Sequence, residues 1–98
     1  MRYDYIHLWS SEEEIRVQCT DPKTITLLEK SIKARFEDCT VTLKNDLDEE
    51  PYGAKVVAAP IKDRHQRIVW WLFKLMCNHG WEPIATGNHW FKMKYYCR

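Results

Sequence analysis

The stretch IVWWLFKLMCNHGW, residues 68–81, holds a single charged residue and three of the chain's five tryptophans. Such a run is compatible with a membrane span, with a core helix, or with a surface that a partner covers. A membrane span needs about 20 consecutive, mainly apolar residues. Arg67 and Lys74 limit the uninterrupted apolar run to residues 68–73. We therefore predict that the stretch does not cross a membrane.

The same stretch fits a helix that we expect to run from residue 64 to residue 78. Asp63 is a suitable N-cap, and Gly80 lies just past the end, where glycine is favoured. At 100° per residue the apolar side chains share one broad helix face. This face comprises Ile68, Val69, Leu72, Phe73, Leu75 and Met76. We expect it to lie in the core.

Two tryptophans fall outside this apolar face. Arg67, Lys74 and Asn78 form a polar stripe on the opposite side, with Trp71 inside the stripe and Trp70 at its edge. In one interpretation the two rings stay within the domain, with Trp71 packed along the side chains of Arg67 and Lys74. In the other, Trp71, Trp70, Arg67 and Lys74 bind a protein partner, because Trp and Arg are enriched at binding hot spots.

The rest of the chain reads as short strands and one further helix. Alternating apolar residues predict strands, while Pro, Gly and acidic clusters mark the loops between them. In chain order we expect strands at residues 2–9 and 14–19 in a hairpin, followed by a helix with Thr20 or Asp21 as its N-cap and Pro22 in its first turn. Strands follow at residues 39–44 and 54–59, separated by an acidic loop, and Pro60 ends the latter strand. A final hairpin turns at Gly87 and Asn88.

The order ββαββαββ predicts an α+β fold with two helices packed on one face of a mainly antiparallel sheet. A chain of 98 residues is long enough for one modest core. We expect residues 1–98 to form a single compact α+β domain that belongs to a larger protein.

Composition and charge narrow the class of protein. Hydrophobic residues make up 45% and charged residues 30% of the chain, as in globular domains. The net charge of +1 argues against a strongly basic nucleic-acid binder but leaves a local basic patch open. The chain starts without the pattern of a secretory signal, and its four cysteines are widely spaced with no C-x-x-C pair. We expect reduced cysteines and a cytoplasmic location.

No catalytic, metal or cofactor motif is evident, so we expect neither enzymatic activity nor a bound cofactor. Cys77 and His79 lie about 200° apart around a helix and cannot both reach one metal ion. Ser10 and Ser11 each precede a glutamate by three residues. This pattern makes both serines candidate phosphorylation sites for an acidophilic kinase.

The last predicted strand alternates in a second informative way. Trp90, Lys92, Lys94 and Tyr96 share one of its faces, and Phe91, Met93, Tyr95 and Cys97 share the other. Joined by Tyr5 and Trp9, with Tyr3 and His7, from the first strand, the former set would form an aromatic and basic surface. Surfaces of this kind stack single-stranded bases. The strand lacks the aromatic pattern of the common RNA-binding sheet domain.

Our leading hypothesis is a non-enzymatic protein–protein interaction domain with its contact surface on the tryptophan-rich helix. Its partner would be another protein or the rest of a larger chain. The alternative is single-stranded nucleic-acid binding, RNA in particular, on the aromatic and basic sheet face. Self-association through an unpaired sheet edge or through the tryptophan helix is a third hypothesis.

Overall fold

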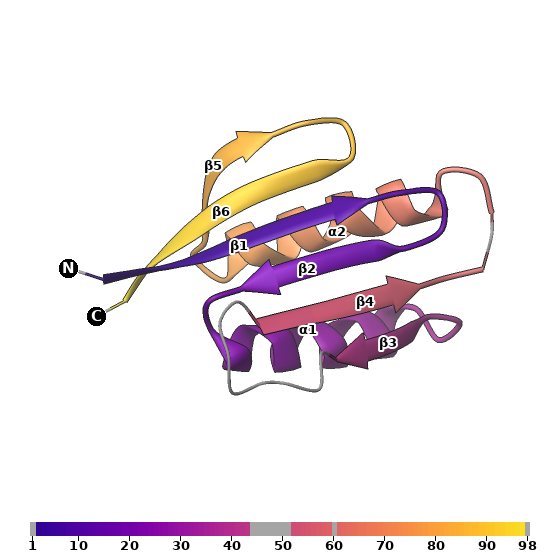
Figure 1. Ribbon diagram of the computed structural model, residues 1–98, viewed down its shortest axis with the longest axis horizontal. Coiled ribbons are helices and arrows are strands. Elements are labelled where there is room, and N and C mark those ends of the chain that lie inside the picture. The colour runs from indigo at the N-terminus through magenta and orange to yellow at the C-terminus, as the bar shows by residue number, and fades with distance from the viewer. Residues whose placement is uncertain (1, 44–51, 60, 98) are drawn as a thin grey trace.

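A computed structural model describes residues 2–43, 52–59 and 61–97 of the chain (Figure 1). Its elements are β1 (Arg2–Ser10), β2 (Ile15–Cys19), α1 (Pro22–Arg35), β3 (Thr40–Leu43), β4 (Tyr52–Val57), α2 (Arg64–Asn78), β5 (Glu82–Thr86) and β6 (Trp90–Cys97). The predicted order ββαββαββ is confirmed. The predicted acidic loop, Lys44 in the third predicted strand, and Pro60 lie outside the described residues.

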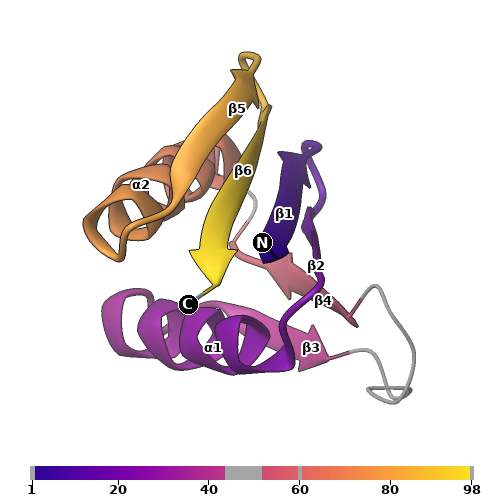
Figure 2. The same cartoon turned by 90° about the vertical axis from the view of Figure 1, so that its left-hand side faces the viewer.

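The six strands form one sheet in the order β3-β4-β2-β1-β6-β5, and every neighbouring pair is antiparallel. In Figure 1 the strands lie in front of both helices, and the turned view in Figure 2 shows both helices on one side of the sheet. Helix α2 contacts β1, whereas α1 contacts β2, β3 and β4. The predicted α+β architecture, with two helices on one face, is therefore confirmed.

The core lies between the sheet and the two helices, because alternate strand residues point toward the helices. Each fully buried aliphatic side chain of this core stabilises the fold by about 1.5–3 kcal/mol. Its buried residues include Ile6, Leu8, Ile15, Val17, Val56, Phe91 and Met93 from the strands, Ile25, Leu28 and Ile32 from α1, and Ile68, Val69, Leu72 and Met76 from α2. The apolar face predicted for α2 thus lies in the core, with Phe73 and Leu75 at its edge.

The start of α1 shows why the chain turns from β2 into a helix. Asp21 is the N-cap residue, and its Oδ1 accepts a hydrogen bond of 3.2 Å from the backbone N–H of Lys23. Its Oδ2 accepts a second one, of 2.8 Å, from the hydroxyl of Thr24. Pro22 occupies the first helical turn, where its missing N–H costs nothing. Of the two predicted caps, Asp21 is the one used.

Helix α2 matches its predicted bounds but begins in a different way from the one predicted. Asp63 is at the N-cap position, yet it adopts a left-handed φ of 61° and makes no side-chain cap hydrogen bond. An N-cap needs an extended backbone to bring its side chain over the first turn. At the other end Gly80 has φ 91°, and Gly80 N–H donates to Cys77 O while Trp81 N–H donates to Met76 O. This pair of bonds is the Schellman motif that the glycine predicted.

Several strand boundaries differ from the predictions by one or two residues: β1 ends at Ser10 rather than at Trp9, and β3 begins at Thr40 rather than at Cys39. Strand β4 runs two residues earlier than expected, because Tyr52 pairs with Cys19 and Gly53 with Gln18. Strand β2 begins at Ile15 rather than at Glu14.

Neither helix in the described part of the chain has the length and hydropathy that a bilayer span requires.

Candidate functional site

The face of the sheet opposite the helices carries no described element (Figure 2). We call it the open face. The pairing of β1 with β6 sets its centre, because cross-strand partners share one face. The partners are Tyr3 with Tyr96, Tyr5 with Lys94, His7 with Lys92, and Trp9 with Trp90. The residues predicted for nucleic-acid binding, Trp90, Lys92, Lys94, Tyr96, Tyr5 and Trp9, therefore lie together on two adjacent strands.

One end of this centre is a tyrosine cluster made of Tyr3, Tyr5 and Tyr96. The ring centroid of Tyr3 lies 5.4 Å from that of Tyr96, edge to face, and 6.4 Å from that of Tyr5. The ammonium of Lys94 lies 5.0 Å from the Tyr3 centroid. Tyr5 is 49% exposed and Tyr96 is 42% exposed. Two rings of the cluster thus offer large surfaces to solvent with a cation beside them.

The other end is a tryptophan cluster made of Trp9, His7 and Trp90. The rings of His7 and Trp9 lie 4.6 Å apart and tilted by 34°, and Trp90 meets His7 edge-on at 6.3 Å. The ammonium of Lys92 lies 6.0 Å from the Trp90 ring. The backbone of Gly87 lies against this indole, since a Cβ atom on Gly87 would collide with Trp90 Nε1. Glycine at this position therefore lets the indole occupy its place on the face.

His7 has an altered acidity in this setting. Burial among its neighbours lowers its pKa below the ordinary value of 6.5, and the positive charge of Lys92 lowers that pKa further. A neutral imidazole is the form favoured next to an ammonium group. His7 is thus a stacking ring at neutral pH and a cation only in more acidic solution.

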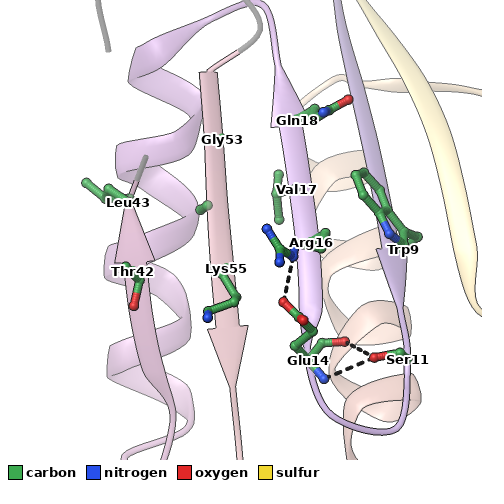
Figure 3. A pocket seen from close by; sticks show the side chains of 11 residues that line it. Trp9, Ser11, Glu14, Arg16, Val17, Gln18, Thr42, Leu43, Gly53 and Lys55 are labelled. Carbon is green, nitrogen blue, oxygen red and sulfur yellow. Dashed lines mark hydrogen bonds and ion pairs between the residues drawn. The ribbon is translucent and has the colours of Figure 1, made fainter. Parts of the chain in front are cut away.

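The half of the open face formed by β2, β4 and β3 is hollowed into a groove of about 700 Å³ (Figure 3). Trp9 stands on one side of it and Thr42 on the other, with Arg16, Gln18, Gly53 and Lys55 between them. Arg16 Nε lies 2.6 Å from Glu14 Oε2. The groove therefore begins beside an aromatic ring and contains two basic side chains.

Among the described residues, the open face is more basic than the chain as a whole. Strand pairing puts four basic residues of this part on the face, Arg16, Lys55, Lys92 and Lys94, and two acidic residues, Glu14 and Glu82. The whole chain has 15 basic and 14 acidic residues. A local basic patch therefore exists despite a net charge close to zero.

The residues predicted for protein binding lie on α2, on the other side of the molecule. The ring centroid of Trp71 is 5.2 Å from that of Phe36, edge to face, and that of Trp70 is 5.5 Å from Phe73. Both tryptophans are half-buried. Arg67 Nη2 donates to the backbone oxygen of Lys62 at 3.0 Å, and Lys74 is exposed. Each tryptophan thus has an aromatic partner within the chain, and protein binding by this surface stays a prediction.

The two serines predicted as phosphorylation sites lie at the tip of the β1–β2 hairpin. Ser10 N–H donates to His89 O at 2.7 Å, which ties the tip to the β5–β6 loop. The Ser11 hydroxyl is exposed and accepts from the N–H groups of Glu13 and Glu14, at 3.2 and 3.3 Å. A phosphate on Ser11 would alter this turn. Modification of either serine stays a prediction.

The cysteines form no disulfide, and three of their thiols, those of Cys19, Cys39 and Cys97, have a raised pKa. All four lie in the described part of the chain, and all are free thiols. Burial raises the pKa of Cys19 to about 11, so the thiol stays protonated. Cys97 donates to Asp4 Oδ2 at 3.0 Å, and this bond raises the pKa of its thiol as well. Among the described residues no three His, Cys, Asp or Glu side chains gather as metal ligands would.

Sequence reasoning did not single out the groove residues Arg16, Lys55 and Gly53. The alternation of Arg16 with Ile15 and Val17 predicts only that its side chain points away from the core. Its neighbour Lys55 is 39 positions away in sequence, and their pairing depends on strand order.

Comparisons of the chain with protein-family models, with curated proteins and with solved structures give no match.

Proposed function

We propose that the open face binds single-stranded nucleic acid. The observation that carries the proposal is the β1–β6 pairing, which interleaves aromatic rings and ammonium groups on a face that no described element covers. Exposed rings stack bases of any sequence, and each stacked base contributes about 1–3 kcal/mol. The lysines beside the rings attract the phosphates. Binding would therefore be tolerant of sequence and sensitive to salt.

The spacing of the two aromatic clusters suits a short strand. Tyr5 and Trp9 are four positions apart on β1, which corresponds to about 13 Å at the rise of a β-strand. At the spacing of about 3.4 Å per nucleotide in a stacked B-form strand, about four nucleotides cover this distance, and fewer are needed when the bases are splayed onto the rings. One short oligomer can therefore contact the tyrosine cluster and the tryptophan cluster at the same time.

The chemistry of the face favours nucleic acid over a protein partner. Protein interfaces are enriched in aromatic residues and arginine but depleted in lysine. Here Lys92 and Lys94 lie at the centre of the aromatic surface, and Lys94 lies within 5.0 Å of the Tyr3 ring centroid. A polyanion that also carries flat bases satisfies both kinds of side chain.

The test is a fluorescence-anisotropy titration of labelled single-stranded RNA and DNA oligomers of about eight nucleotides at low salt, with a duplex for comparison. We expect binding of single strands, and a loss of roughly tenfold or more in affinity for Trp9→Ala and for Trp90→Ala. Trp70→Ala is the matched control on α2 and should leave the affinity unchanged. Absence of binding by the wild-type protein at high micromolar concentration would refute the proposal, and so would equal losses for all three variants.

A further inference from the structure

One row of side chains crosses the open face at a single level. Strand pairing joins Trp90 to Trp9, Trp9 to Arg16, Arg16 to Lys55, and Lys55 to Thr42. Neighbouring strands lie about 4.8 Å apart. The aromatic half of the row therefore continues directly into a cationic half, which lies in the groove of Figure 3.

The direct pairing of Arg16 with Lys55 is unfavourable for the isolated fold. Like charges on opposed strand positions destabilise a sheet. Glu14 offsets part of this repulsion, because its Oε2 lies 2.6 Å from Arg16 Nε. In the described part of the chain Lys55 takes part in no such ion pair. An anion in the groove would be attracted by both cations and would relieve their repulsion.

Gly53 leaves space for such an anion. It lies on β4 opposite Gln18 and lines the groove two residues from Lys55, next to the Arg16–Lys55 pair along the strands. The backbone conformation of Gly53 does not require glycine, because its φ is not positive, unlike that of Gly80. Glycine within a strand often marks a place where a ligand approaches the backbone closely.

We infer that the groove binds a phosphate group of the nucleotide whose base stacks on Trp9. This inference rests on the proposed function and extends its path: a strand that follows β1 from the tyrosine cluster to the tryptophan cluster would turn at Trp9 and cross β2 toward β4. Arg16 supplies a planar donor group that matches phosphate oxygens, and Lys55 supplies a mobile point charge. Glu14 competes with the phosphate for Arg16, so it weakens binding.

The test is the salt dependence of oligomer affinity between about 50 and 200 mM salt. Each phosphate neutralised on a single strand contributes about 0.7 to the slope of log K against log salt. We expect Lys55→Gln to reduce the slope by about this amount. Trp9→Ala should lower the affinity with the slope unchanged, and Lys30→Gln, at an exposed position of α1, should change neither.

Two further variants distinguish phosphate binding in the groove from a general effect of the protein's charge on affinity. Glu14→Gln should raise the affinity about two- to threefold, since it frees Arg16 for phosphate. Gly53→Val should narrow the groove beside Arg16 and Lys55 and lower the affinity several-fold, while the fold keeps its stability because valine suits a strand. Oligomers with and without a 5′-phosphate show which phosphate is bound: tighter binding of the phosphorylated form assigns a terminal group, and equal binding assigns an internal phosphodiester.

Failure of the inference is distinct from failure of the proposed function. One outcome is that the wild-type protein binds the oligomer and Trp9→Ala weakens this binding, while Lys55→Gln keeps the full salt slope and Gly53→Val keeps the full affinity. In that case the groove binds no phosphate. If the wild-type protein binds no oligomer, the proposed function itself is wrong.

Discussion

The aromatic side chains on the open face and those on α2 are both partly exposed, but they are built differently. On α2, Trp70 contacts Phe73, which in turn contacts the fully buried Phe91. On the open face, His7 contacts Trp9 and Trp90, and a lysine lies over the latter. Trp70 thus leads into the core, and Trp71 packs on Phe36, over whose ring Arg35 and Arg64 lie at 5.3 and 5.4 Å. The open-face rings instead meet one another and lysines. The contacts of a half-buried tryptophan indicate its role better than its exposure does.

The largest expected effect concerns stability. Trp71→Ala removes the edge-to-face contact with Phe36 and should lower the free energy of unfolding by about 2–3 kcal/mol, less than the 3–5 kcal/mol of a fully buried tryptophan. Trp9→Ala removes contacts on the open face alone and should cost about 1 kcal/mol. Urea denaturation followed by circular dichroism measures both. Equal losses would remove the distinction between the two groups.

If Trp71→Ala instead leaves the free energy of unfolding unchanged and abolishes binding to a protein partner, that result would support the interaction surface predicted on α2.

A pair of glycine substitutions sharpens the comparison. In Gly87→Ala the new Cβ collides with the Trp90 indole, so the ring must move, and oligomer affinity should fall by about 1 kcal/mol, roughly fivefold. Gly80→Ala is the matched control: its φ of 91° makes alanine strained, which should cost about 1 kcal/mol of stability without changing affinity. Anisotropy titration and urea denaturation of both variants provide the check. Unchanged affinity in Gly87→Ala would show that the position of Trp90 does not matter for binding.

The smallest expected effect is the pH dependence that His7 confers. Its pKa in the folded protein is below 6.5, so the unfolded chain takes up the proton first. The contribution of neutral His7 to the free energy of unfolding is therefore fully present above about pH 6.5. It is lost as the pH falls toward the lowered pKa of His7. Phosphates near the ring favour the protonated form, so oligomer affinity should rise a few-fold from pH 8 to pH 6. His7→Gln should reduce both trends. Identical pH profiles for the variant and the wild type would exclude His7 as their source.

The fold was largely predictable because its signals are local. Alternation placed the strands, Asp21 and Pro22 marked the start of α1, and Gly80 marked the end of α2. The left-handed φ of Asp63 was not predicted, although aspartate adopts a positive φ several-fold more often than most other residues.

The candidate site was predictable only in part because it depends on long-range pairing. The alternation of β6 showed which of its residues share a face, but the pairing of Trp9 with Trp90 joins residues 81 positions apart. Arg16 and Lys55 acquire a shared role only through strand order. The aromatic partner of Trp71 is Phe36, the C-cap residue of α1. No local sequence pattern relates this residue to α2.

The most direct measurement of the central claim is a two-dimensional ¹H–¹⁵N NMR titration that follows the indole N–H signals of the tryptophans, assigned by single substitution, as a single-stranded oligomer is added. All five tryptophans report at once, so the open face and α2 are compared in one sample. We predict that the Trp9 and Trp90 signals shift with the oligomer, while those of Trp70 and Trp71 stay in place. Shifts confined to Trp70 and Trp71, or no shift in any of these signals, would contradict the account.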